Sequence, residues 1–296
     1  YNGEFANVLK NVNVAIDAQF NSPNYAINYF GLGNDTKNFE ADENDGMDVN
    51  LDFNRVRIRS FHVMPSFVWR GQQEANFRIG FIYETNEVER TPSRFIETIP
   101  EDDAVFDDQN FYGVEASYNY ENRDNDAFPT LGMLVNLTTG YKNNTQTSKG
   151  FGYIIPELGF AYRLEPSGKV VLATKFHAHF NLGNDFEFYQ GAQLGAKTGL
   201  RGFRNERFTG KRAYVQTTDL RWNFGNLKTS VVPFSMGIYG GFDYGRVWVS
   251  NDTSKKWHNN FGGGFFINVV DFVVGSVGLF DSDDGLRFSF NLGFGF

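Results

Sequence analysis

The sequence predicts an all-β fold, namely one transmembrane antiparallel β-barrel of about twelve strands formed by residues 1–296, with a long extracellular loop folded into its lumen. Three observations predict it. Apolar and polar residues alternate along many segments, which is the period of a β-strand. Long and short connections between these segments also alternate. Aromatic residues are abundant, with 33 Phe and 14 Tyr, whereas Pro is scarce at 8, and this balance favours strands over helices.

The alternation is clearest near the two ends of the chain. Residues 11–20 carry apolar side chains at every second position, and residues 286–296 do so with aromatics. A soluble β-sandwich also alternates apolar with polar, and it is the alternative fold. Such a sandwich rarely ends on a strand with one face this aromatic. The last segment therefore predicts a lipid-facing surface, made by Leu286, Phe288, Phe290, Leu292, Phe294 and Phe296.

Twelve segments show this pattern, and their connections differ in length in a regular way. Connections after odd-numbered segments are mostly long and those after even-numbered segments mostly short, as in outer-membrane barrels with long extracellular loops and short periplasmic turns. We therefore expect a bacterial outer-membrane protein with both termini in the periplasm. The segments are 11–20, 51–70, 75–84, 111–121, 131–141, 151–164, 169–182, 213–224, 232–249, 257–268, 272–280 and 286–296.

Composition excludes several other classes of protein. No cysteine is present, which excludes a disulfide framework and thiolate metal sites. The net charge of −8 argues against a nucleic-acid-binding protein, which needs a basic face. No apolar run approaches the ~18 residues of a membrane-spanning helix. The mean hydropathy of −0.40 fits a barrel in which only alternate residues face lipid. Because residue 1 is Tyr, we expect a processed or truncated chain.

One loop, residues 199–212, is basic in this acidic chain. It holds five Lys or Arg residues among fourteen, and three glycines that permit positive backbone φ angles. Leu200, Phe203 and Phe208 alternate with the charges, although a solvated loop has little use for apolar side chains. This pattern predicts a loop that folds back into the barrel and plugs it.

Two carboxylates are placed to receive an arginine of that loop. Outward-facing apolar residues in 232–249 and 213–224 leave Asp243 and Asp219 on the inward face of their strands. An unpaired carboxylate in a partly dry lumen is costly, and a guanidinium forms a bidentate, charge-assisted pair with it. We predict that Arg201 pairs with Asp243, with Asp219 as a second acceptor.

Three motifs, in the same order, resemble the barrel of the BamA/TamA superfamily, also called the bacterial surface antigen family. Leu200, Arg201, Gly202 and Phe203 match its loop motif, usually Val/Ile-Arg-Gly-Phe/Tyr. Residues 242–245 partly match its strand motif, with Phe242 and Gly245 at the ends, and residues 123–132 resemble its Arg-Asp…Pro-Thr-x-Gly turn. The resemblance runs from about residue 111 to the C-terminus.

The resemblance implies a function and a set of partners. It implies a membrane anchor, or a translocation or insertion module, for a periplasmic domain N-terminal to Tyr1, without catalytic residues or a cofactor in this chain. The expected partners are outer-membrane lipid, lipopolysaccharide and the outer-membrane assembly machinery, which would read Phe294 and Phe296 as a C-terminal signal. The stretch 28–34 is similar to a subgroup fused to a calcineurin-like metallophosphoesterase domain. The best-known superfamily members have sixteen strands and POTRA repeats, which this sequence lacks.

Two possible metal sites are weak. His177 and His179 share one strand face, but no third ligand is evident, so we expect no metal. The stretch 42–48 loosely suggests a calcium loop, yet Phe53 stands where such a loop needs its bidentate Glu.

Two alternative functions remain, an outer-membrane phospholipase-type hydrolase and a passive pore. A hydrolase working on membrane lipid would need a His and a Ser that break the outward apolar pattern. Only His62, on the same face as Ser60, is a plausible exception.

Overall fold

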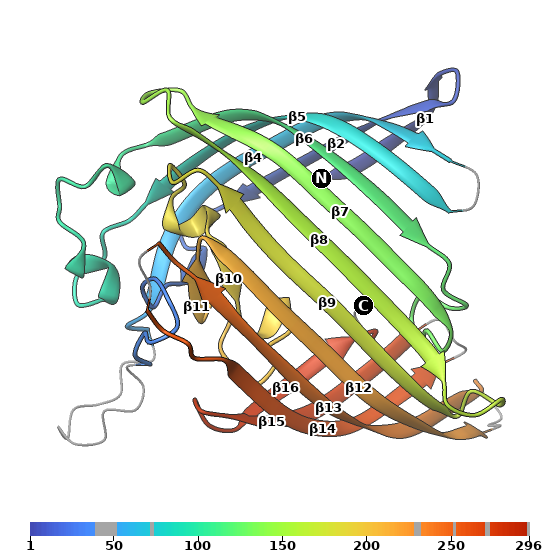
Figure 1. Ribbon diagram of the computed structural model, residues 1–296. Helices are drawn as coiled ribbons and strands as arrows, with labels where there is room; N and C mark the ends of the chain where they lie inside the picture. Colours follow the sequence, from blue (N-terminus) through green and yellow to red (C-terminus); the bar gives the residue numbers. More distant parts are fainter. Residues whose placement is uncertain (39–51, 72–73, 228–231, 251–252, 270–272, 295–296) are drawn as a thin grey trace.

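A computed structural model describes residues 1–38, 52–71, 74–227, 232–250, 253–269 and 273–294. The chain forms one strongly curved 14-stranded sheet whose hydrogen-bonded neighbours run antiparallel, and a two-stranded sheet inside it (Figure 1). Among the described residues, no helix is long and apolar enough to cross a membrane. The main path consists of β1 (Asn2–Leu9), β2 (Val12–Asn21), β4 (Arg55–Arg70), β5 (Ala75–Val88), β6 (Gln109–Glu121), β7 (Gly132–Asn144), β8 (Gly150–Arg163), β9 (Val170–Leu182), β12 (Arg212–Leu227), β13 (Phe234–Trp248), β14 (His258–Val269), β15 (Val273–Ser282) and β16 (Arg287–Leu292).

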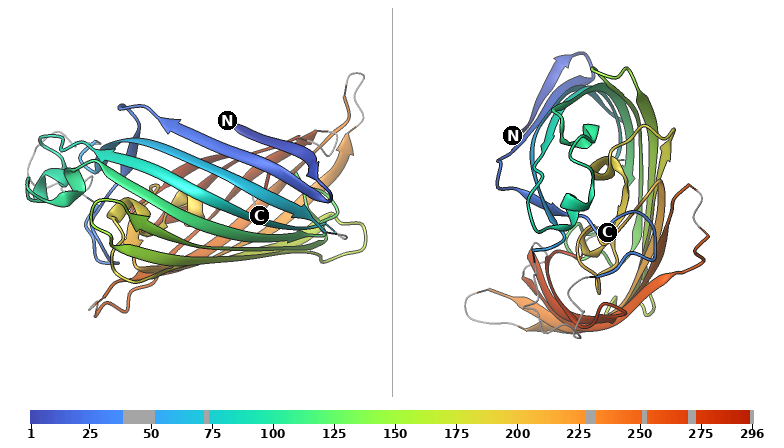
Figure 2. Two further views of the ribbon diagram at one scale, coloured as in Figure 1. Left: turned by 90° about the horizontal axis from the view of Figure 1, so that it is seen from above. Right: turned by 90° about the vertical axis from the view of Figure 1, so that its left-hand side faces the viewer.

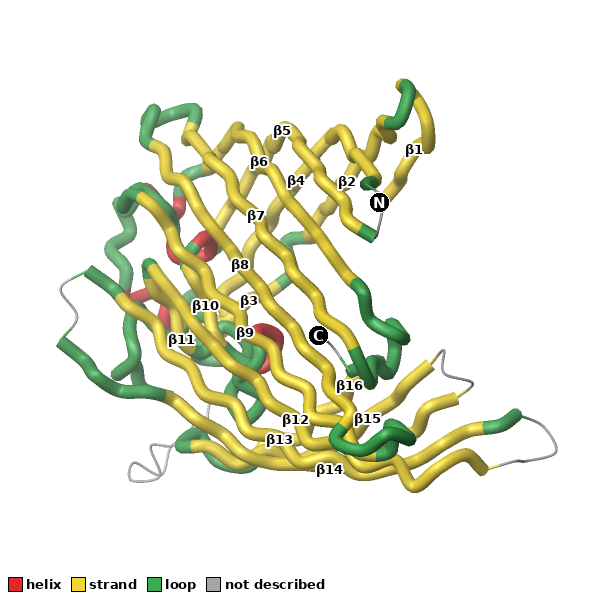
Figure 3. The backbone as a smooth tube through the Cα atoms, turned by 45° about the vertical axis from the view of Figure 1, so that its right-hand side comes forward, coloured by secondary structure: helices red, strands yellow, loops and turns green. Residues whose placement is uncertain are grey.

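The strands alternate their side chains between an outer and an inner face. On β12, Leu220 and Trp222 are exposed, whereas Asp219 and Arg221, which alternate with them, are buried. Pairing carries this alternation around the sheet, because Asp219 lies opposite Gly241 of β13 and Ala173 of β9. The apolar face therefore points outward, and the polar face points into the lumen. The long tilted strands form a curved, barrel-like wall (Figure 3).

All twelve predicted segments contain strands, but the prediction missed two strands of the main sheet and both strands of the small sheet. β1 forms a hairpin with β2, and β3 (Ala26–Asn28) pairs with β4 beside the main path. The β1–β2 register shifts between Phe5 and Leu9, which breaks the alternation that would have signalled a strand. Within the described residues, the sheet is not closed, because no pairing joins β1 to β16.

The end of the last strand also differs from the prediction. Phe288, Phe290 and Leu292 are exposed on the outer face as expected, but β16 stops at Leu292. Gly293 has a φ of +82°, which turns the chain, and Phe294 is buried inside the barrel. The prediction of a lipid-facing Phe294 is therefore wrong. Phe296 lies outside the described residues.

The long acidic loop between β5 and β6 is partly folded. It contains two short 3₁₀ turns, Phe95–Thr98 and Ala104–Phe106, whose Ile96 and Val105 are buried. They pack in one apolar cluster with Tyr29 and Phe188. This end of the barrel, which carries the loops seen end on in Figure 2, is called the plug end below. The opposite end, at the turn between β6 and β7, is the turn end.

Candidate functional site

The candidate site is the loop between β9 and β12, residues 183–211, which we call the plug. It contains the 3₁₀ turns Phe188–Gln190 and Ala196–Thr198 and a small sheet of β10 (Ala192–Leu194) and β11 (Phe208–Gly210). Figure 1 shows these elements inside the curve of the main sheet. A loop with its own hydrogen-bonded pairs can present side chains at fixed positions.

An apolar cluster anchors the plug to the wall. Leu200 and Phe203 are fully buried, and Phe208 almost so. They pack with the inner face of β12 and β13, through Ala213, Val215 and Val247. Burial of each such large apolar side chain contributes roughly 1.5–3 kcal/mol, so the cluster favours the inserted position of the loop.

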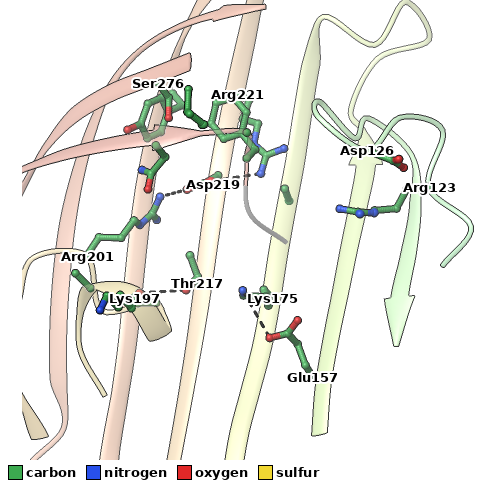
Figure 4. A pocket seen from close by; sticks show the side chains of 18 residues that line it. Arg123, Asp126, Glu157, Lys175, Lys197, Arg201, Thr217, Asp219, Arg221 and Ser276 are labelled. Atoms are coloured by element: carbon green, nitrogen blue, oxygen red, sulfur yellow. Dashed lines mark hydrogen bonds and ion pairs between the residues drawn. The ribbon is translucent and has the colours of Figure 1, made fainter. Parts of the chain in front are cut away.

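Arg201 forms a fork on Asp243. Its Nε donates to Oδ2 at 2.9 Å and its Nη2 donates to Oδ1 at 2.6 Å, while its backbone N–H donates to Oδ2 at 3.2 Å. Its Nη1 lies 2.8 Å from Oδ1 of Asp219 (Figure 4). Asp243 has no exposed surface. One guanidinium therefore pairs with two inward carboxylates on adjacent strands, and bidentate geometry makes the Asp243 contact specific for arginine.

Two glycines allow the plug to approach the wall this closely. The backbone N–H of Gly202 donates to Oδ1 of Asn260 at 2.9 Å, and the Gly202 carbonyl accepts from Oγ of Ser282 at 2.8 Å. A Cβ atom on Gly202 would lie 2.6 Å from the Cβ of Asn260. A Cβ atom on Gly241 would collide with the Arg201 guanidinium. Glycine is therefore needed at positions 202 and 241, because any larger residue there would clash with the groups that hold the plug.

Several partners in this site were not predicted. They are Asn260 and Ser282, which hold Gly202, and Phe280, whose ring centre lies 4.2 Å from the Arg201 guanidinium carbon. A cation over an aromatic face adds to the attraction. The only sequence signal for these residues was the alternation along β14 and β15, which places their side chains on the inner face. Arg221 is the fourth charged group, with Nη2 3.4 Å from Asp219.

A cavity of about 540 Å³ lies against this charge cluster. Arg201, Asp219 and Arg221 line it together with Lys175 of β9, which pairs with β12, and Glu157 of β8 (Figure 4). The Lys175 Nζ lies 3.7 Å from Oε2 of Glu157. The charges around the cavity are thus arranged in pairs, which suits a hydrated lumen better than a site for a large net charge.

The remaining predicted residues lie apart from this cluster. Phe242 is exposed on the outer face of β13. Gly245 of the same strand packs closely against Tyr214 and Val215 of the neighbouring strand β12. Phe294 joins an apolar cluster at the turn end. Calcium-loop residues 42–48 lie outside the described residues.

The histidines also face the lumen. His177 and His179 line one inner cavity, and His62 lies opposite Glu84 across β4 and β5. Oε2 of Glu157 lies 3.4 Å from the His177 ring nitrogen, and Oδ1 of Asn181 lies 3.0 Å from that of His179. Within the part of the chain that the structure describes, no three His, Cys, Asp or Glu residues form a metal-binding group.

Comparison with known proteins shows the fold. No protein-family model and no curated protein matches the sequence. Among solved structures, BamA from Haemophilus ducreyi lacking POTRA domains 1–3 is similar, with a TM-score of 0.64 and 12% identity. The match covers 96% of this chain and 62% of that chain. This chain therefore has a fold similar to that of the BamA β-barrel.

Proposed function

We propose that this chain is the outer-membrane anchor, or the translocation or insertion module, of a periplasmic partner domain. In this role both termini lie in the periplasm, and the outer apolar face contacts lipid and lipopolysaccharide. The observation that carries it is the occupied lumen: the plug is held by Arg201 on two buried carboxylates and by a buried apolar cluster.

An occupied lumen argues against a passive pore, because solutes would have to displace packed side chains. It favours a barrel whose main role is to hold something in the membrane. The partner domain that the sequence resemblance implies is a calcineurin-like metallophosphoesterase N-terminal to Tyr1. The hydrolase alternative loses support, because His62 faces inward, where it lines a cavity together with Tyr189 and Gln193 of the plug.

The translocation or insertion variant has one supporting observation of its own. β1 and β16 end the sheet without pairing to each other among the described residues. Free strand edges offer backbone groups to which another strand can add. In this variant the assembly machinery and a client polypeptide are the partners.

Conductance in planar bilayers separates an occupied lumen from a passive pore. We expect low steady conductance from the natural sequence and a higher, noisier conductance from Arg201→Ala. Lys197→Ala is the matched control, because Lys197 lies in the same plug with a largely exposed side chain. Large, stable conductance from the natural sequence, unchanged in Arg201→Ala, would contradict the proposal and support the pore.

The anchor role is tested on the complete gene. The region encoded upstream of Tyr1 is produced with and without residues 1–296, and membrane association is measured by flotation. Association only when the barrel is attached supports the anchor. Equal association in both forms would refute it.

A further inference from the structure

The described sheet keeps a barrel-like curve although its edges, on β1 and β16, do not pair with each other (Figure 2). Two groups of contacts join the N-terminal part of the sheet, which we call the N-terminal wall, to its C-terminal part, the C-terminal wall. One group lies at the plug end and the other at the turn end. We propose that these contacts hold the open sheet in shape and take the place of edge pairing. We call them the strap, residues 29–36 with Arg207, and the clasp, residues 125–128 with Phe294.

The strap begins at β3, which is paired with β4 of the N-terminal wall. It turns inward through Gly31 and Gly33, both with φ near +100° (96° and 102°). Leu32 forms a parallel bridge with Thr209 of the plug, and the Gly33 N–H donates to the Thr209 carbonyl at 2.8 Å. The strap thus adds one short strand-like contact to the plug.

Asn34 then joins the strap to the C-terminal wall. Its Nδ2 donates to the Val247 carbonyl at 2.7 Å, and its Oδ1 accepts from the Val247 N–H at 3.0 Å. The amide side chain therefore binds β13 through the same two backbone groups that a neighbouring strand would use. Asn34 is 2% exposed and Val247 is fully buried, so water does not compete for these bonds.

Arg207 fastens the strap to the last hairpin. Its Nη1 donates to Oγ1 of Thr36 at 2.7 Å and its Nη2 donates to the Thr36 carbonyl at 2.9 Å. Its Nε donates to Oδ2 of Asp284, between β15 and β16, at 2.6 Å. The guanidinium carbon lies 4.7 Å and 4.6 Å from the ring centres of Phe30 and Phe208. One buried side chain thus joins strap, plug and hairpin.

The clasp joins the walls at the turn end. Oδ1 of Asn125 accepts from the backbone N–H groups of Ala127 and Phe128, which fixes the β6–β7 turn. The Phe128 ring lies 5.1 Å from that of Phe266 and 5.6 Å from that of Phe294. The Phe294 N–H donates to the Ala127 carbonyl at 3.3 Å. The inward turn of the C-terminus therefore brings it against the opposite wall.

Distance measurements between spin labels test the proposal in a chain that has no native cysteine. The label pair Phe20→Cys with Leu286→Cys reports the plug end, and Val12→Cys with Leu292→Cys reports the turn end. In lipid, we expect Arg207→Ala to shift the plug-end distances to larger values and broaden them, with no change at the turn end. Phe128→Ala should have the opposite effect.

Arg59→Ala is the matched control, because Arg59 pairs with Glu87 on the exposed face of the wall. If Arg207→Ala does not fold, Arg207→Lys, which keeps the charge and loses the planar fork, is measured in its place. Distances that stay unchanged in both the strap and clasp variants, or that change at both ends in each, would overturn the proposal. The measurement needs no partner domain and no activity, so its failure is separate from failure of the proposed function.

Discussion

Replacing Arg201 with alanine should free the plug. The substitution removes three side-chain contacts, two to Asp243 and one to Asp219, and leaves Asp243 without exposed surface and without its cation. Removing one partner of a buried ion pair costs about 3–5 kcal/mol. The adjacent cavity of about 540 Å³ can admit water to the carboxylates, so we expect a loss of about 3 kcal/mol in the free energy of unfolding.

Urea unfolding from lipid and limited proteolysis measure this effect. Trypsin should cut Arg201→Ala rapidly between Arg204 and Arg212 and should cut the natural sequence slowly, while the strand content of both stays equal. Lys197→Ala should behave as the natural sequence. Arg201→Lys should recover only part of the stability, because an ammonium cannot form the bidentate fork. Equal, rapid cleavage of the natural sequence and Arg201→Ala would refute an inserted plug.

Three further outcomes are expected. Gly241→Ala should lower the free energy of unfolding by about 1–3 kcal/mol, because the new methyl group displaces the Arg201 guanidinium, and Gly275→Ala, which meets no atom, is the control. Phe294→Ala should cost about 3 kcal/mol by leaving a cavity among aromatic rings; no change in urea unfolding would place Phe294 outside the barrel. Burial raises the pKa of Asp124, but hydrogen bonds from the Thr130 side chain, the backbone amides and Arg163 together hold it below its ordinary value. The stability from Asp124 is therefore present above pH ~4 and lost as pH falls through the lowered pKa, so the difference in unfolding between the natural sequence and Asp124→Asn should vanish in acid.

Much of the wall was predictable because a strand has a strict period of two. That period placed Asp243 and Asp219 inside from their apolar neighbours alone, and it located every one of the twelve segments. It failed where a strand stops being regular. The irregularity between Phe5 and Leu9 disrupts the alternation in β1, so this strand was not predicted. The positive φ of Gly293 turns Phe294 inward, whereas the alternation predicts an outward side chain only if the strand continues.

The partners of the plug and strap were less predictable. Asn34 binds Val247 across 213 residues, and neither residue belongs to a pattern that points to the other. Asn260 and Ser282 were predictable only as inward-facing residues. Which of several inward groups meets a loop depends on where that loop enters, and the entry point is set by tertiary packing of Leu200 and Phe203 rather than by local sequence.

A double-mutant cycle on Arg201 and Asp243 tests the central claim, that this pair holds the plug inside the barrel. The free energy of unfolding is measured for the natural sequence, Arg201→Ala, Asp243→Ala and the double variant. If the two side chains contact as the structure places them, the double variant should be no less stable than Arg201→Ala, with a coupling energy of about 2–3 kcal/mol. Losses that add fully, with no coupling energy, would contradict the account.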